Sequence, residues 1–192
     1  MRFVVFDIET KMKALGRGRL NPDELELTVV GIYDSESDAY TSYLKEELSK
    51  LWPILERTDL LIGFNSNTFD IPILNRYYPG DLSKIRSLDL LAEVHAALGR
   101  RIRLDSLAQA TLGRGKTGDG LKAGVWWEEG KFDLVRHYCI EDVRLTKELY
   151  DYALKNGSLQ YRDLNQKREI KLDTAHWNIP SAAPALTHAL PL

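Results

Sequence analysis

Cysteine is nearly absent from this sequence, and so are long apolar runs and any large excess of one charge. The single cysteine, Cys139, excludes an intramolecular disulfide and fits a reducing compartment. No apolar run approaches the roughly 20 residues that span a bilayer. Asp7 also interrupts the N-terminal apolar stretch too early for a secretory signal. We therefore expect a cytoplasmic protein with no membrane partner.

The charges are almost balanced, with 26 basic and 28 acidic residues and a net charge of −2. A protein that coats duplex DNA without sequence preference is usually basic, so this class is not expected. Any contact with nucleic acid should then be local, at a strand end. Acids gathered in a metal site would not forbid such binding, because the bound cations restore positive charge where the phosphate lies.

The length of 192 residues, 44% of them hydrophobic, suits one domain with a proper core. Short apolar runs predict strands, and apolar residues at helical spacing predict helices. The expected strands cover residues 2–6, 27–33, 39–43, 59–64 and 85–90. The expected helices cover residues 44–57, 68–78, 91–98, 104–112 and 131–155. Strands early and helices later indicate an α/β fold, a mixed central sheet flanked by helices.

Two stretches, residues 11–19 and 113–120, are rich in glycine and basic residues and are expected to be loops. The domain is expected to cover residues 1–172. A proline-containing C-terminal tail over residues 173–192 would be irregular, and a protein partner could order it.

The first candidate site residues are Asp7 and Glu9, in the run Phe6-Asp7-Ile8-Glu9-Thr10 at the end of the first predicted strand. Side chains two apart on a strand point to the same face. Two carboxylates on one face repel each other, and a cation between them removes that cost. An isolated pair of this kind is most often simply solvated, so the pair needs support from elsewhere.

Two more acids lie in distinctive places. Asp70 follows a polar turn after a buried strand, at the start of a predicted helix, where the helix dipole alone would favour it. Asp142 lies inside the long predicted helix, one turn after Tyr138 and on the same face. Aspartate is a poor helix former, so Asp142 calls for a reason such as an ion pair with Arg144, plain exposure or a functional role.

Together these segments resemble a known family. The runs F-D-I-E-T, N-x-x-x-F-D and Y-C-x-x-D are similar to the three exonuclease motifs in the proofreading domain of family B DNA polymerases. That domain belongs to the DEDD 3′→5′ exonucleases, in the tyrosine-bearing branch. The motifs occur in the family's order and on the expected elements, and the similarity spans residues 2–152.

The resemblance implies a ribonuclease H-like fold and a site for two Mg²⁺ or Mn²⁺ ions, held by Asp7, Glu9, Asp70 and Asp142. It implies that Asp7 contacts both ions, that Glu9 and Asp142 support the ion on the nucleophile's side, and that Asp70 acts on the other. Tyr138 would orient the attacking water. The expected reaction releases 5′-mononucleotides from a single-stranded 3′ end, with DNA preferred over RNA.

The resemblance also indicates residues that bind the nucleic acid beside the motifs. Thr10, Asn65 and Phe69 are expected in this role. Lys11 and Lys13 follow the first motif and would contact the phosphate backbone, although a solvated basic loop is an equal alternative.

The third motif allows a second interpretation. A related histidine branch has H-x-x-x-x-D, and His137 to Asp142 fits that spacing. A four-residue step on a helix turns about 40° away from a full circle, whereas a five-residue step turns about 140° away. Helix geometry therefore favours Tyr138, with His137 as the alternative catalytic residue.

The chain leaves no room for polymerase palm, fingers or thumb, so proofreading in cis is not expected of these residues. Two other functions stay open at this point. One is an RNA or short-oligonucleotide exonuclease with the same site. The other is a non-catalytic nucleic-acid-binding module, which the intact set of four acids and Tyr138 argues against.

Overall fold

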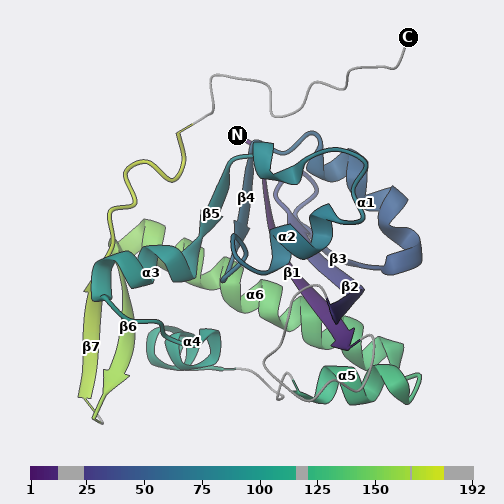
Figure 1. The fold of residues 1–192 in the computed structure, drawn as a ribbon. Coiled ribbons are helices and arrows are strands. Elements are labelled where there is room, and N and C mark those ends of the chain that lie inside the picture. The colour runs from purple at the N-terminus through teal and green to yellow at the C-terminus, as the bar shows by residue number, and fades with distance from the viewer. Residues whose placement is uncertain (13–23, 116–120, 165, 180–192) are drawn as a thin grey trace.

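A five-stranded mixed sheet forms the centre of the computed structural model, which describes residues 1–12, 24–115, 121–164 and 166–179 (Figure 1). The strand order is β3-β2-β1-β4-β5. Strands β1, β2 and β3 pair antiparallel, whereas β4 and β5 continue the sheet in parallel. The bounds are β1 Phe3–Met12, β2 Leu25–Asp34, β3 Ala39–Leu44, β4 Leu60–Gly63 and β5 Ser87–Asp89.

Helices cover both faces of this sheet (Figure 1). They are α1 Leu48–Leu55, α2 Asp70–Asn75, α3 Leu90–Leu98, α4 Leu104–Leu112, α5 Leu121–Glu128 and α6 Phe132–Asn156, with short 3₁₀ helices at Lys45–Glu47 and Leu82–Lys84. Val4 of β1 packs in a core with α1 and α2. Its neighbour Val5 packs in another core with α3, α4 and α6. Alternate residues of β1 thus face opposite layers, as the pleat of a strand requires.

The expected α/β architecture is confirmed, and several element bounds differ from the predicted ones. Strand β1 runs on to Met12 because it forms a long antiparallel ladder with β2, with an irregularity between Glu9 and Thr10. The beginning of the expected loop at 11–19 therefore lies in a strand, and residues 13–19 lie outside the described residues. Helix α2 is shorter than the predicted 68–78.

Two elements had not been expected: helix α5 and the hairpin of β6, Ser158–Asp163, with β7, Gln166–Lys171. Strand β7 is mostly charged and exposed. Its apolar pattern is therefore too weak to predict a strand, and pairing with β6 defines it. The hairpin lies beside α3 and α4 (Figure 1).

The described part of the C-terminal segment, residues 173–179, lies against the domain. Trp177 is fully buried and stacks on Tyr150, with ring centroids 5.8 Å apart. Arg86 donates hydrogen bonds to three backbone oxygens of this segment, including that of Trp177 at 3.2 Å. The expected division after residue 172 stays a prediction, and residues 180–192 lie outside the described part. None of the helices described is both long and apolar enough to cross a membrane.

Candidate active site

The sheet topology brings the three motifs to one place. Strand β4 runs parallel to β1 with Val5 opposite Ile62. The segment that follows β4 therefore emerges beside Asp7 and leads to Asp70, the first residue of α2. Helix α6 packs on β1 and β2 from the other layer and carries Tyr138 and Asp142 on buried positions.

A close approach between α6 and β2 determines how near the third motif lies to the sheet. A Cβ atom at Gly31 would lie 2.9 Å from Sγ of Cys139 and 3.3 Å from the Cys139 carbonyl carbon. Real Cβ atoms essentially never come within 3.0 Å of another heavy atom, and 3.3 Å is tighter than most contacts, so glycine lets the helix lie this near the sheet. Since Gly31 is also paired with Asp7 on β1, the same contact brings α6 close to the first motif.

The first and third motifs touch through Cys139. Its thiol donates to the backbone oxygen of Asp7 at 3.4 Å and lies 3.8 Å from Asp7 Oδ2. A carboxylate oxygen of Asp7, a carboxylate oxygen of Glu9 and the Cys139 sulfur all lie within 4.8 Å of one another. The alternation of Asp7 and Glu9 along the strand therefore places both acids on the side that α6 covers.

The second motif is tied to the first strand by Asp70. The backbone N–H of Ile8 donates to Asp70 Oδ1 at 3.1 Å, in a buried position. Only 4% of Asp70 is exposed. Burial is the main cause that raises the pKa of Asp70, and the negative charges of Asp89 and Asp142 add to it, whereas the Ile8 N–H lowers it; the net pKa is about 7. The Asp70 carboxyl thus faces two more acids with little access to water.

The pKa of Cys139 is affected by the other acids of the motifs. Burial raises the pKa of its thiol well above the ordinary value, and Asp7, Glu9 and Asp142 raise it further. The thiol therefore stays protonated, and it acts as a hydrogen-bond donor to Asp7. Asp142 therefore acts on both Asp70 and Cys139, and Asp7 and Glu9 act on the same thiol.

The donor set suits a hard divalent cation. Carboxylate oxygens are the ligands that Mg²⁺ and Mn²⁺ prefer, and the protonated thiol offers no soft thiolate. Carboxylates gathered in a region of low exposure repel one another, and a cation among them removes that repulsion. The residues present therefore fit a divalent metal site, with Asp7, Glu9, Asp70 and Asp142 as the candidate ligands.

One residue of the site was not anticipated. Asp89, at the end of β5, is 5% exposed and accepts backbone N–H groups from Asn65 at 2.7 Å and Asn67 at 3.1 Å. It also accepts those of Leu91 at 3.0 Å and Ala92 at 3.3 Å, at the start of α3. Asp89 thus holds the beginning of the second motif, where Asn65 takes a left-handed φ of 68°. An aspartate directly before a predicted helix is a capping signal that could have revealed it.

The other expected residues lie around this centre. Thr10 and Lys11 are half-buried on β1, and the Lys11 ammonium lies 5.9 Å from the centroid of the Trp127 ring. Phe69 is half-buried beside the core under α2. Lys13 lies outside the described residues.

The two alternatives at the third motif differ in environment. Tyr138 is 4% exposed, with its ring edge-on to Trp126 at a centroid distance of 6.1 Å. His137, the next residue back on α6, is exposed. The buried tyrosine therefore lies on the packed side of α6, in an apolar cluster that includes Val29 of β2.

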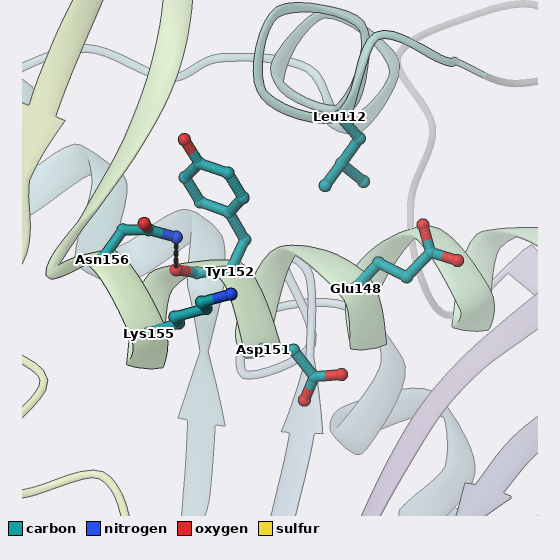
Figure 2. A pocket seen from close by; sticks show the side chains of 6 residues that line it. All are labelled: Leu112, Glu148, Asp151, Tyr152, Lys155 and Asn156. Carbon is teal, nitrogen blue, oxygen red and sulfur yellow. Dashed lines mark hydrogen bonds between the residues drawn. The ribbon is translucent and has the colours of Figure 1, made fainter.

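A separate hollow of about 380 Å³ lies between the end of α4 and the C-terminal half of α6 (Figure 2). Its lining mixes acids, a lysine and neutral side chains: Leu112, Glu148, Asp151, Tyr152, Lys155 and Asn156. None of the site residues expected from the sequence belongs to it.

Comparison with known proteins agrees with this geometry. DNA polymerase 1 of Aeropyrum pernix is 30% identical over an alignment of 156 residues that covers 67% of this chain and 15% of that protein. The structure of a family B DNA polymerase from the archaeon Pyrobaculum calidifontis superposes with a TM-score of 0.62 at 20% identity, covering 80% of this chain and 24% of that one. The chain thus spans about a quarter or less of these polymerases.

The expected ribonuclease H-like fold and the resemblance to the exonuclease domain of family B polymerases are confirmed by these matches. The model of one family, described as the RNase_H superfamily, matches residues 4–154, from the start of β1 almost to the end of α6. The matched region contains all three acidic motifs, and this chain therefore belongs to the RNase H superfamily.

Proposed function

We propose that this RNase H-like nuclease domain is a metal-dependent 3′→5′ exonuclease that hydrolyses single-stranded or frayed DNA 3′ ends to 5′-mononucleotides. The observation that carries the proposal is the cluster of Asp7 and Glu9 carboxylate oxygens with the Cys139 sulfur, all within 4.8 Å of one another, beside the buried Asp70 carboxyl that accepts the Ile8 N–H. The negative charge of the buried Asp142 raises the pKa of both Asp70 and the Cys139 thiol, which links the third motif to the other two.

In this proposal Asp7, Glu9, Asp70 and Asp142 hold two Mg²⁺ or Mn²⁺ ions. Such ions lower the pKa of a bound water and stabilise the charge that develops on the attacking and leaving oxygens. The chain's own groups supply the positioning. The Cys139 thiol and the Ile8 N–H fix the orientation of the Asp7 and Asp70 carboxylates. Tyr138 orients the attacking water, and Thr10, Lys11, Lys13, Asn65 and Phe69 contact the strand.

DNA is the proposed substrate because the sequence relative and the structural neighbour are both DNA polymerases. An RNA or short-oligonucleotide exonuclease would use the same acids. Reading of the 2′-hydroxyl is what separates the two at a given site. The location in the cytoplasm is proposed on the composition alone.

A labelled-strand assay tests this function. Single strands of DNA and RNA with a 5′ label are incubated with the protein and Mg²⁺ or Mn²⁺. A ladder that shortens from the 3′ end is expected for DNA, and EDTA should abolish it. The matched variant is Asp7→Ala, which should remove nearly all turnover while circular dichroism shows a folded protein. Digestion of closed circles, or full activity of Asp7→Ala, contradicts the proposal.

A second assay separates Tyr138 from His137. Loss of a group that positions water or transfers a proton costs roughly 10²–10⁴-fold in rate, so Tyr138→Phe should lower kcat on this scale. His137→Ala should stay near wild type. Inactivation by His137→Ala alone assigns the chain to the histidine branch.

A further inference from the structure

The connector between α3 and α4 carries three exposed arginines, Arg100, Arg101 and Arg103, within four residues. It lies next to the β6–β7 hairpin, at the end of the molecule that α3 and α4 share (Figure 1). Two of these arginines make contacts that connect the active-site region with the hairpin.

Arg101 reaches the segment of the second motif. Its guanidinium donates to the side-chain oxygen of Asn65, which also accepts from the Thr68 hydroxyl at 2.9 Å. The backbone N–H of Asn65 is held by Asp89, which acts on the charge of Asp70. Within the part of the chain that the structure describes, Arg101 contacts this neutral amide and no carboxylate, so its positive charge is not neutralised.

Arg100, the neighbour of Arg101, contacts the β6–β7 hairpin. Its guanidinium lies over the ring of Tyr161, 5.0 Å from the centroid, and 3.5 Å from Asp163. Arg168 of β7 lies 3.4 Å from the same carboxylate. Two guanidinium groups therefore share one acid, which leaves a positive excess on the hairpin side as well.

We propose that Arg101, Arg100 and Arg168, here named the arginine rim, bind the phosphate backbone of the single strand whose 3′ end lies at the carboxylates. The proposal rests on the exonuclease function and extends it by naming the track of the strand. Arg101 would contact the phosphates nearest the site, and Arg168 those farther from the 3′ end.

The chemistry favours phosphate at this rim. Guanidinium groups bind phosphate oxygens in bidentate fashion, and each exposed arginine that does so releases counterions from the strand. The net charge of the chain is −2, so general attraction to nucleic acid is weak and a local track is needed. Arg101 contacts Asn65 of the second motif, so the strand would enter the arginine rim next to the acids.

Substrate length provides the test. The KM for 3′ digestion is measured on a thymidine dinucleotide and on a 12-nucleotide thymidine strand. Arg101→Ala should raise the KM of the long strand about tenfold, as expected for one charge-assisted contact, and that of the dinucleotide less. Arg168→Ala should affect only the long strand. The matched control is Arg57→Ala, an exposed arginine in the turn before β4, at the opposite end of that strand from Asn65; it should change neither value.

Direct binding separates this proposal from the function on which it rests. The anisotropy of a fluorescein-labelled 12-nucleotide strand is followed in EDTA over a range of salt concentrations. One lost phosphate contact reduces the slope of log K against log salt by about 0.7. If Arg101 acts only by holding Asn65 in place, Arg101→Ala should leave this slope unchanged. Asn65→Ala should then lower the affinity as much as Arg101→Ala does.

The outcomes are distinct. Affinity and salt slope that depend on Arg101, in a protein that digests no strand, support the rim and contradict the exonuclease function. Normal digestion with unchanged length dependence and salt slope in Arg101→Ala overturns the rim and leaves the function intact.

Discussion

Two buried aspartates at opposite ends of the central strand illustrate different uses of the same side chain. Asp34 ends β2 opposite Val4, and Asp70 accepts the N–H of Ile8 farther along β1. Their exposed fractions are similar, 6% and 4%. Burial raises the pKa of both. For Asp34, burial is the largest single cause, but bonds from the Arg2 guanidinium at 2.7 and 3.1 Å, together with those from the Glu36 N–H and the Ser37 hydroxyl, outweigh it and lower the net pKa.

Asp70 faces carboxylates where Asp34 faces a guanidinium, and its pKa rises to about 7. An acid with a permanent cationic partner holds the fold together. An acid among acids costs stability, and such a cost is typical of a site that binds a cation. The comparison therefore assigns a structural role to Asp34 and supports a ligand role for Asp70.

The largest expected effect is on activity at the Asp70 end. Asp70→Asn should lower kcat by about 10²–10³-fold, because the carboxylate that stabilises charge through the cation is lost. The melting temperature in EDTA should stay the same or rise, since a repelling charge disappears. Activity near wild type in a folded Asp70→Asn protein would contradict the ligand role that distinguishes Asp70 from Asp34.

The reciprocal change should act on stability. Asp34→Asn removes the buried one of the two acids that pair with the Arg2 guanidinium and leaves the exposed Glu36, at 2.6 Å, as its remaining anionic partner. Removal of one member of a buried pair costs up to about 3 kcal/mol. Urea denaturation in EDTA should show this loss in the free energy of unfolding. The kcat of the folded fraction should stay close to wild type, and a loss as large as that of Asp70→Asn would contradict a purely structural role.

Divalent cations should stabilise the protein through the acids around Asp70 and not through Asp34. At a Mn²⁺ concentration 100 times its Kd, the wild type should gain about 2.7 kcal/mol by mass action. Asp142→Asn should blunt this gain while leaving the apo protein as stable or more so, and Asp34→Asn should keep it in full. Thermal denaturation with and without Mn²⁺ measures all three, and a wild type that does not respond argues against the metal site.

The smallest expected effect concerns pH. Because the folded pKa of Asp70, about 7, lies above its unfolded value, its protonation stabilises the apo protein at low pH. That contribution is complete below about pH 4 and is lost as pH rises through 7. A cation displaces the same proton, so Mn²⁺ affinity should rise about tenfold per pH unit up to 7 and then level off. Titration calorimetry from pH 5.5 to 8 measures this dependence, and a flat profile would show that Asp70 is ionised throughout.

Much of the site could be found from the sequence because its signals are local. The two-residue step from Asp7 to Glu9 and the four-residue step from Tyr138 to Asp142 follow from strand and helix geometry. The role of Asp89 depends on Asn65 and Asn67, more than twenty residues away, and no local pattern gives that contact. Helix α5 and the β6–β7 hairpin were missed for a similar reason, since their pairing and packing partners define them more than their own periodicity.

By itself, the sequence determined the order of the elements, the α/β class and which acids are candidates, because strand and helix periods and the three motifs lie within short segments. The tertiary structure alone decided which of these groups meet. Gly31 lets α6 approach β1, Ile8 holds Asp70, and Arg101 reaches Asn65. The physical reason is that pKa values, close approaches and ion pairs depend on distances between segments, and only the packed chain fixes those distances.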